Sequence, residues 1–423
     1  MASTGSNSSV REPEVAAART DIALVLTSYN DARTIGPAVR AMRDGLSRHV
    51  GSGSARFILV DAGSTDGTED AARAAAAPSA PIDVARVGPP GLADIPYHGY
   101  PRRAAALRTA LETAARLQAK ACVFVDPGLL VPDAAWTERL LSPVLSGGFD
   151  YVSPYYVRRA NEGALTRGIV YPMFRALYGV RLRQPAGHEF ACSRQLVAYY
   201  LEQDFWEFDQ ADAGVDLWLA TAAACGPFRA CETALGARPP PSRDAPTDLG
   251  TTLAQVVGAL YADLEHRVDV WQRVRGSVAV PLVGAVPTAE VEPVSASLEP
   301  LIESFRLGYR ELREIWTWVL PPRTIVELRK LADGGAEAFR FDDRLWATIV
   351  YDFALGYTMR VMPRDHLLRS LAPIYSGWAA SFLLQVGGAT TVAVEDRVEQ
   401  ICRAFEAEKR YLISRWRWPE RLR

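Results

Sequence analysis

Cysteine is scarce in this chain, and long apolar runs are absent. The five cysteines among 423 residues are scattered, odd in number and never spaced as C-x-x-C, which argues against a disulfide framework and against a cysteine-based zinc site. No segment approaches the roughly 18 apolar residues of a membrane-spanning helix, and the first twenty residues lack the apolar stretch of a signal peptide. These absences predict a cytoplasmic protein without a membrane partner.

An excess of either charge is also absent. The formal net charge is -2, with 49% hydrophobic and 23% charged residues, a balance that does not favour nucleic acid as a partner. A chain of this length can bury a large core in one large or two medium domains. Residues 1–20 are polar and rich in Ser and Ala, and we expect them to form a disordered tail.

Strands and helices alternate in the segment that follows. Apolar β-formers end in polar loops and lead into helical patterns, in the order IALVLTSYND, ARTIGPAVRAMRDGL, ARFILVDAGS, GTEDAARAAAA, RRAAALRTALETAARLQ and ACVFVDPGLLV. This alternation predicts right-handed βαβ units and a mainly parallel sheet. We therefore expect an α/β, Rossmann-like domain over residues 21–250.

The pattern becomes helical after the proline-rich stretch ARPPPSRDAPTDLG. Apolar residues then recur at helical spacing, with Pro or Gly breaks between segments. We expect a helical C-terminal domain over residues 251–423, with the stretch near residues 280–296 as its main internal loop. Its faces are rich in Trp, Phe and Leu, which makes a homodimer one option for this protein.

Polar residues follow the strands at the expected carboxyl edge of the sheet, where open α/β sheets bind their ligands. They are Ser28, Tyr29, Asn30, Asp61, Asp66 and Asp126. In VDAGSTDGT, a strand-end Asp can accept hydrogen bonds from a base or ribose, and small residues let backbone N–H groups approach a nucleotide. Asp66 is equally compatible with capping the next helix, but capping does not explain Asp61.

The motifs TSYND and VDAGSTDGT resemble the donor-binding half of GT-A glycosyltransferases that use nucleotide-diphosphate sugars. Further segments are similar to glucosylglycerate and mannosylglycerate synthase-like enzymes, namely VSPYYVRRANEGALTRGIVYPMFRALYG, RQPAGHEFACSRQL, AGVDLWL and RLWATIVYDFALGYTM. The likeness runs over most of the chain from about residue 21. It implies a GT-A fold with a helical C-terminal part, and transfer of a hexose, with retention, to a small hydroxy-acid acceptor.

The resemblance also implies where the donor is bound. Tyr29, Asn30, Asp61 and Asp66 match positions around the nucleotide. Asp126 matches the first aspartate of the DxD element, which holds a divalent cation, Mg²⁺ or Mn²⁺, against the diphosphate.

The chain departs from this metal-binding pattern at two places. Pro127 and Gly128 stand where a second acid is usual, and the loop GARPPPSRD lacks the expected histidine. Asp244 or Asp248 could substitute as ligands. Alternatively, Arg102 and Arg103 at a helix N-terminus could replace the cation, although both are equally compatible with surface charges.

The resemblance further implies catalytic and acceptor-binding residues. Glu189 matches an acid near the reacting sugar, and Asp216 matches the acid beneath the donor sugar, although Asp216 could instead be a charge at a helix N-terminus. His188 stands where relatives usually have glycine, which either narrows the sugar pocket or is a structural feature. The resemblance places acceptor binding at Arg158, Arg159 and Asn161, and arginine suits a carboxylate because its planar fork binds it with two hydrogen bonds.

Two alternatives to an active transferase of this kind stay open. The first is a catalytically inactive homologue that binds a nucleotide-sugar or serves as a scaffold, which the degraded metal motif favours. The second is a transferase with a different acceptor in secondary metabolism.

Overall fold

The computed structural model describes residues 19–47, 54–78, 80–88, 100–129, 133–158, 162–208, 210–238, 248–285, 298–335 and 339–417. The expected tail at residues 1–20 lies outside the described residues except for Arg19 and Thr20. The proline-rich loop before residue 248 lies outside them as well.

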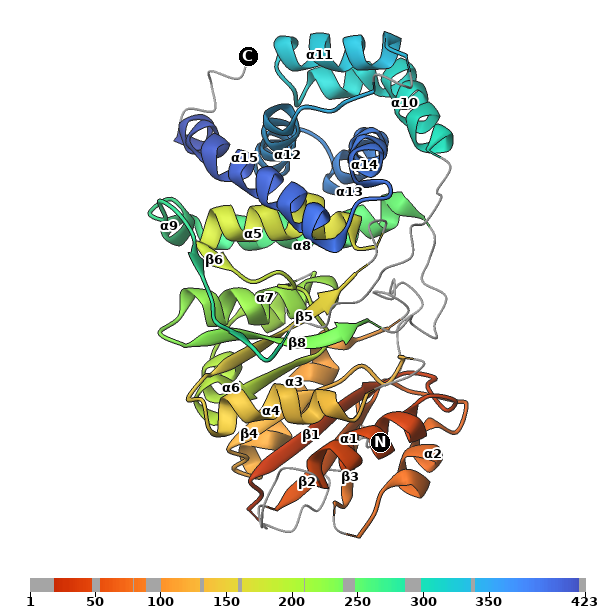
Figure 1. Ribbon diagram of the computed structural model, residues 1–423, viewed down its shortest axis with the longest axis vertical. Coiled ribbons are helices and arrows are strands. Elements are labelled where there is room, and N and C mark those ends of the chain that lie inside the picture. The colour runs from red at the N-terminus through yellow and green to blue at the C-terminus, as the bar shows by residue number, and fades with distance from the viewer. Residues whose placement is uncertain are drawn as a thin grey trace, which may run out of the picture.

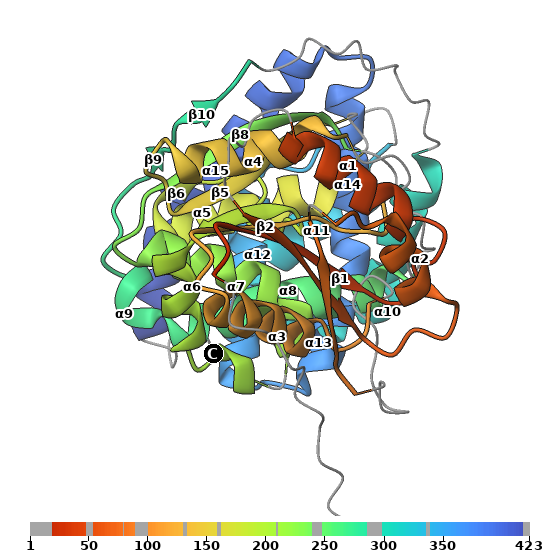
Figure 2. The same ribbon diagram turned by 90° about the horizontal axis from the view of Figure 1, so that it is seen from below.

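One eight-stranded sheet organises the first half of the chain (Figure 2). Its strand order is β10-β8-β5-β7-β4-β1-β2-β3, and β7 runs antiparallel to both of its neighbours while the other pairs are parallel. The strands are β1 (Ile22–Ser28), β2 (Ala55–Asp61), β3 (Ile82–Arg86), β4 (Ala121–Phe124), β5 (Tyr151–Val157), β7 (Phe190–Ser193), β8 (Ala230–Ala237) and β10 (Leu282–Val283). The predicted α/β class with a mainly parallel sheet is confirmed.

Helices cover both faces of this sheet, and the alternation of side chains along each strand explains why. In β1, Ile22, Leu24 and Leu26 join the core beneath one face, while Ala23 and Val25 join the core beneath the other. The first core is closed by α1 (Ile35–Ser47), α2 (Thr68–Ala75) and α4 (Ala135–Leu145), and the second by α3 (Arg103–Arg116), α6 (Arg194–Leu201) and α7 (Ala211–Cys225). Strands buried on both faces therefore read as continuous apolar runs.

The helical part is stacked on this domain (Figure 1). Helices α5 (Tyr171–Tyr178) and α8 (Leu249–His266) lie between the sheet and the outer helices α10 (Glu299–Thr317), α11 (Pro322–Asp333), α12 (Asp343–Met359), α13 (Arg364–Ser370), α14 (Ala372–Val386) and α15 (Thr391–Arg417). One continuous apolar core runs from α3 to α15. The predicted helical C-terminal part is confirmed.

Short elements complete the chain. They are the π-helix η1 (Thr166–Val170), the 3-10 helix η2 (Phe205–Glu207), α9 (Val268–Trp271), and β6 (Val180–Arg181), which pairs with β9 (Val278–Ala279). Strand β10 follows the predicted boundary at residue 250 and yet pairs with β8, so the chain returns to the sheet within the stretch expected to be a loop. Of the helices that the structure describes, none combines the length and the apolar character needed to cross a bilayer.

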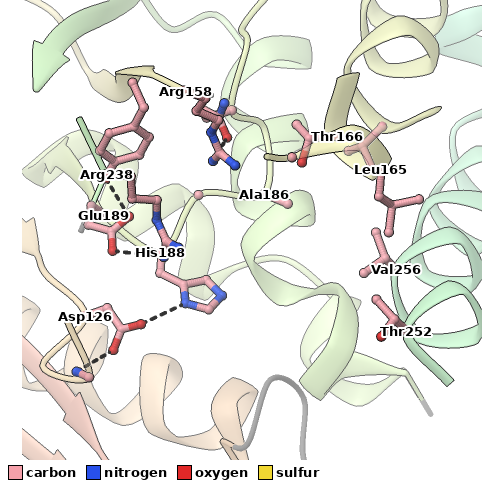
Figure 3. Close-up of a pocket in the computed structure, with 16 residues that line it drawn as sticks. Asp126, Arg158, Leu165, Thr166, Ala186, His188, Glu189, Arg238, Thr252 and Val256 are labelled. Carbon is pink, nitrogen blue, oxygen red and sulfur yellow. Dashed lines mark hydrogen bonds and ion pairs between the residues drawn. The ribbon is translucent and has the colours of Figure 1, made fainter. Parts of the chain in front are cut away.

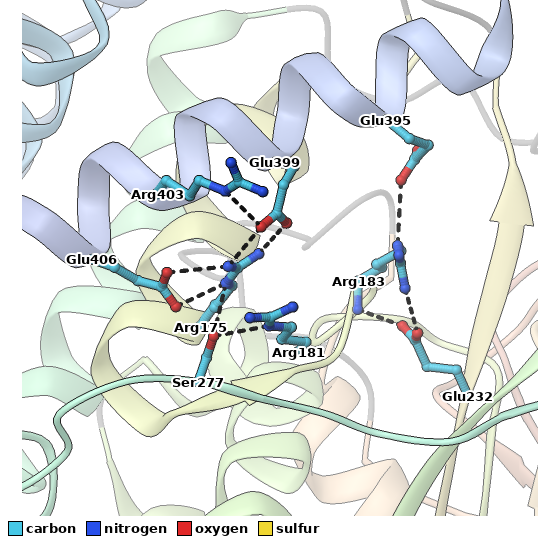
Figure 4. Close-up of polar contacts among 9 residues, drawn as sticks. All are labelled: Arg175, Arg181, Arg183, Glu232, Ser277, Glu395, Glu399, Arg403 and Glu406. Atoms are coloured by element: carbon cyan, nitrogen blue, oxygen red, sulfur yellow. Dashed lines mark hydrogen bonds and ion pairs between the residues drawn. The ribbon is translucent and has the colours of Figure 1, made fainter.

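Ion pairs join α15 to α5, which lies next to the sheet domain (Figure 4). The guanidinium of Arg175, whose side chain is 1% exposed, donates to both Glu399 and Glu406 on α15 and to Ser277. We call this cluster of Arg175, Ser277, Glu399 and Glu406 the α5–α15 joint. It ties the last helix of the chain to its middle third.

Candidate active site

A cavity of about 290 Å³ opens at the carboxyl ends of the parallel strands. It lies between the ends of β4, β5 and β8, the segment that leads into β7, and the helices η1 and α8 (Figure 3). The polar side chains of Asp126, His188, Glu189 and Arg238 gather on one side, and Leu165 and Val256 lie on the other. We call this the strand-end cavity. Its position is the one predicted for the ligand of an open α/β sheet.

Four side chains contact one another in series beside this cavity, in the order Asp126, His188, Asp216 and Arg103. His188 lies between two carboxylates, with Nδ1 3.3 Å from Oδ2 of Asp126 and Nε2 3.5 Å from Oδ2 of Asp216. Arg103 donates to both oxygens of Asp216, through Nε at 2.5 Å and Nη2 at 2.7 Å. The second oxygen of Asp126 accepts the Gly128 N–H at 2.8 Å. Asp126, Asp216 and Arg103, which the sequence assigned to three different roles, thus belong to one network.

This network corrects two expectations. Arg103 is 3% exposed, so it is not a surface charge, and the pull of Asp216 raises its pKa although burial alone would lower it. Asp216 is 3% exposed and lies inside α7, which begins at Ala211. The alternative of a charge at a helix N-terminus is therefore wrong, because the helix begins five residues earlier than the motif suggested.

A second polar cluster lines the cavity around Glu189. The Glu189 side chain is fully buried, accepts a hydrogen bond from the Tyr156 hydroxyl at 2.7 Å through Oε2, and has Nη2 of Arg238 3.7 Å from Oε1. Burial, together with the charge of Glu189, raises the pKa of Tyr156 well above its usual range. The Oε1 atom of Glu189 has no hydrogen-bond partner, so a buried acceptor remains available at the cavity.

Arg158 supplies a matching unpaired donor. Its Nη2 donates to Oε1 of Gln184 at 2.7 Å, but its buried Nε has no hydrogen-bond partner. Burial, and then the nearby charge of Arg238, lower the pKa of Arg158 to about 10. Gly163 is needed at its side, because its φ is +66° and a Cβ there would lie 2.6 Å from Nη1 of Arg158. A buried cation held against another cation favours an anionic ligand.

The two loops predicted to hold the nucleotide meet at the same edge of the sheet. Ser28 pairs with Asp61 in the parallel register, and β1 lies between β2 and β4. The Asp61 carboxylate accepts hydrogen bonds from Ser28 Oγ at 3.0 Å, the Gly63 N–H at 3.1 Å, and Ser64 N–H and Oγ at 2.8 and 2.5 Å. The predicted convergence of Asp61 and Asp126 on one edge is therefore found, and Asp61 shapes the loop that follows it.

Asn30 and Asp66 link these two loops. Asn30 has φ of 53° and accepts the Thr65 N–H through Oδ1, and Asp66 accepts from the Ala32 N–H and from Thr68. Burial works against the charge of Asp66, but the hydrogen bonds from Thr68 and Ala32 outweigh it and lower its pKa. Tyr29 donates its N–H to Asp31. Asp66 thus holds the first loop and accepts hydrogen bonds from Thr68, the first residue of α2, whereas the N-cap position of that helix is Gly67.

Three of the predicted site residues, Asp126, Arg158 and Glu189, line the cavity. The other described ones do not, namely Tyr29, Asn30, Asp61, Asp66, Arg102, Arg103 and Asp216. Arg102 is the N-cap residue of α3 and lines a separate hollow with Arg108 and Asp212, so it points away from its neighbour Arg103. Arg159 and Asn161 lie outside the described residues. Of the predicted acceptor-binding set, Arg158 alone is placed.

The described residues fit a metal ion poorly. Among them, no three or more His, Cys, Asp or Glu side chains are grouped so that they could hold one. Asp248 caps α8 and accepts from Gly250, Thr251 and Arg369, whereas Asp244 lies outside the described residues. Asp126 itself stands at the strand end where the resemblance places the first metal ligand.

Arg238 and Tyr156 were missed from the sequence. Both lie at strand ends, Tyr156 on β5 and Arg238 directly after β8. Open α/β sheets bind ligands at the carboxyl ends of their strands, and applying this rule to β5 and β8 would have indicated both residues. The sequence signal for Arg238 was weak, because GARPPPSRD has the composition of a loop and shows no strand or helix pattern.

No protein-family model matches the chain. Over 204 residues it is 31% identical to glucosyl-3-phosphoglycerate synthase of Mycolicibacterium paratuberculosis (strain ATCC BAA-968 / K-10), a match that covers 44% of this chain. The chain resembles this glycosyltransferase. The match spans 57% of the relative's length, less than two thirds of it. The predicted likeness to glucosylglycerate synthase-like enzymes is confirmed as a resemblance.

Solved structures of glucosyl-3-phosphoglycerate synthase from Mycobacterium tuberculosis are also similar to the chain. The complex with phosphoglyceric acid is 26% identical with a TM-score of 0.40, and the match covers 57% of this chain and 79% of that one. The complex with Mn²⁺, UDP-glucose and phosphoglyceric acid is 25% identical, with the same coverage and a TM-score of 0.41. The complex with Mg²⁺ and UDP is 25% identical, again with the same coverage, and has a TM-score of 0.42.

Proposed function

We propose that this protein transfers a hexose from a nucleotide-diphosphate sugar to a small acceptor that carries a hydroxyl and an acidic group, as glycerate and its phosphate ester do. The observation that supports it best is the strand-end cavity, whose lining includes Arg158 and Glu189, each with a buried polar atom that has no hydrogen-bond partner. Buried polar atoms without partners are costly, and a ligand would satisfy them. The resemblance to glucosyl-3-phosphoglycerate synthase supports the same activity.

The charges in the cavity suit the two parts of such a reaction. Arg158 and Arg238 would bind the acidic group of the acceptor, because a guanidinium fork matches a carboxylate or phosphate. Glu189 would accept a hydrogen bond from a hydroxyl of the transferred sugar. The loops held by Asp61 and Asp66 would bind the nucleotide. Asp216, whose position is fixed by Arg103, would lie beneath the donor sugar and supply a negative charge there.

Transfer with retention is the expected stereochemistry. The bond between the anomeric carbon and the diphosphate oxygen breaks, and the acceptor oxygen forms its bond on the same face of the sugar. The acceptor hydroxyl gives its proton to the departing phosphate oxygen. No protein nucleophile is needed in this scheme, and the protein contributes position and charge.

A divalent cation is a candidate cofactor, since the solved structures from Mycobacterium tuberculosis include complexes with Mn²⁺ or Mg²⁺. A cation of this kind would spread the charge of the leaving diphosphate. In this chain only Asp126 stands at an expected ligand position, and both of its oxygens already have partners.

The test is a direct assay with a small matrix of substrates. The purified protein is incubated with UDP- and GDP-hexoses and with glycerate or 3-phosphoglycerate, and nucleotide release and the product are followed. We expect release that depends on the acceptor, with the donor's anomeric configuration kept in the ¹H NMR coupling of the product. The Glu189→Gln variant should bind nucleotide normally and turn over at least tenfold more slowly.

A second candidate is a nucleotide-sugar binder without turnover. It is favoured by Pro127 and by the absence of a metal-binding group among the described residues. Thermal stabilisation by UDP or GDP with no turnover toward any acceptor would support it over the transferase. Turnover with an acceptor that lacks an acidic group would instead support a different acceptor class.

A further inference from the structure

The carboxylates that would face a metal in this protein already have all of their oxygens engaged. Asp126 accepts the Gly128 N–H on one oxygen and meets the His188 ring on the other. Asp216 accepts two hydrogen bonds from Arg103 and also lies beside His188. A Mg²⁺ or Mn²⁺ ion needs such oxygens at roughly 2.0–2.2 Å. Its entry would require the imidazole to leave first.

His188 occupies the space between the two carboxylates, as Figure 3 shows for its contact with Asp126. Both ring nitrogens face carboxylate oxygens, at 3.3 and 3.5 Å. In the DxD pattern the second acid would fall at Gly128, and neither Gly128 nor Pro127 has a side chain that could bind a metal.

The charges of the side chains around His188 and the strand-end cavity balance one another. Three carboxylates, those of Asp126, Asp216 and Glu189, lie among three guanidinium groups. These belong to Arg103, Arg158 and Arg238. A site that depends on a divalent cation keeps an excess of carboxylate for the cation to neutralise. This group of six side chains has no such excess.

We propose that His188, held between Asp126 and Asp216, takes the place of the divalent cation, so that the protein binds a nucleoside diphosphate without a metal ion. The guanidinium N–H groups of the nearby arginines then meet the diphosphate oxygens that a cation would otherwise bind, while the ring nitrogens of His188 stay against Asp126 and Asp216. The inference about the nucleotide rests on the proposed function, whereas the exclusion of metal from Asp126 does not.

The first experiment measures nucleotide affinity with and without metal. UDP and GDP are titrated calorimetrically into metal-stripped protein, in EDTA and then in Mn²⁺. We expect the dissociation constant of the nucleotide that binds to change less than threefold between the two conditions. Affinity that rises tenfold or more with Mn²⁺ would overturn the proposal. Failure of both nucleotides to bind counts against the proposed function, and the next measurement then decides the metal question alone.

The second experiment needs no nucleotide. The electron paramagnetic resonance signal of free Mn²⁺ is recorded as wild-type protein is added at about 100 μM. We expect the free signal to be unchanged. Binding at this concentration that disappears in Asp126→Asn would show that the metal site exists and would contradict the inference.

A pair of variants tests the role of His188 itself. His188→Gly opens the space beside Asp126, and His188→Gln keeps it filled with a side chain that can donate one hydrogen bond. We expect His188→Gly to bind nucleotide at least tenfold more weakly in EDTA and to recover part of that loss in Mn²⁺. His188→Gln should lose less affinity and show no response to Mn²⁺. If Mn²⁺ affects both variants equally, or if neither loses affinity, His188 does not replace the cation.

Discussion

Two arginine clusters in this molecule differ in how completely they are paired. At the α5–α15 joint, the Arg175 guanidinium donates to Glu399, Glu406 and Ser277. At the strand-end cavity, Arg158 leaves Nε without a partner, and Glu189 leaves Oε1 without one. Arg175 is buried and Arg158 is half-buried. The first cluster holds two parts of the fold together, and the second is the one that we propose binds a ligand.

A buried polar atom without a hydrogen-bond partner does not by itself distinguish the two clusters. The strand-end cavity differs because a cationic donor and an anionic acceptor of this kind belong to two residues that line it, Arg158 and Glu189. Arg306, Arg364 and Arg415 of the helical part also have a buried Nε without a partner. None of these three lines the strand-end cavity. An unpaired donor beside an unpaired acceptor at a cavity is therefore the more selective mark of a binding site.

The largest effect is expected at the joint. Arg175→Met should lower the free energy of unfolding by about 3 kcal/mol, because it leaves two glutamates without their buried counterion. Denaturant unfolding measures this loss. The matched control is Arg403→Ala, since Arg403 also binds Glu399 but its side chain is 72% exposed, and it should change stability by at most about 0.5 kcal/mol. Equal losses in both variants would show that burial of the pair does not matter.

A smaller effect concerns a buried carboxyl in the helical part. Burial raises the pKa of Asp352 to about 7, although Arg415 lies 2.7 Å away and opposes the shift. The folded state then binds a proton more tightly than the unfolded state, whose carboxyl keeps its usual pKa near 3.8. Stability from this group is therefore present at low pH and lost as the pH rises from about 4 to 7.

Asp352→Asn should remove this dependence. Over that window the free energy of unfolding of the wild type should fall relative to that of the variant by about 2 kcal/mol. Urea titrations at several pH values measure the difference. Parallel pH profiles for the two proteins would mean that Asp352 stays ionised in the fold.

Replacing an arginine by methionine at the strand-end cavity should change the affinity for a ligand and not the free energy of unfolding. Arg158→Met should weaken the affinity for 3-phosphoglycerate by 10- to 100-fold, about 1.5–3 kcal/mol, because it removes charged hydrogen bonds. The free energy of unfolding should stay equal or rise, since a buried unpaired Nε is also removed. Calorimetric titration and urea unfolding are run on the same samples. A clear loss of stability with unchanged affinity would place Arg158 with the joint and not with the cavity.

The smallest effect should come from Gly163. Gly163→Ala places a Cβ 2.6 Å from Nη1 of Arg158 at a φ of +66°, so it should move the guanidinium and weaken acceptor binding by two- to tenfold. Gly276→Ala is the control, because a Cβ there meets nothing within 4 Å. No difference between the two variants in acceptor affinity would show that the position of Arg158 is not critical.

The sheet and the edge that carries the site could be predicted from the sequence because each strand ends in a change from apolar to polar residues. Asp61 and Asp126 illustrate this, since strand polarity alone places them on one edge. The ion pair between Arg103 and Asp216 could not be predicted, because the partners are more than a hundred positions apart and only the packing of α3 against α7 joins them.

Helix boundaries show a similar limit. The apolar pattern of DHLLRSLAPIYSGWAASFLLQV, residues 365–386, predicts one helix, but the structure divides it into α13 and α14 just before Pro373. Proline is tolerated in the first turn of a helix and not in its interior. Strand β10 was also missed, because two residues at a sheet edge leave no periodic signal.

The contact between Gly168 and Trp378 makes the shape of the cavity a property of both halves of the chain. Trp378 on α14 packs so closely on η1 that a Cβ at Gly168 would lie 2.0 Å from its ring, and Trp346 on α12 donates its indole N–H to the Gly168 carbonyl at 2.8 Å. The segment η1 also carries Thr166, which lines the cavity. A chimera that joined this sheet domain to a foreign helical module would therefore need to keep both tryptophans, or the substrate-facing wall would lose its support.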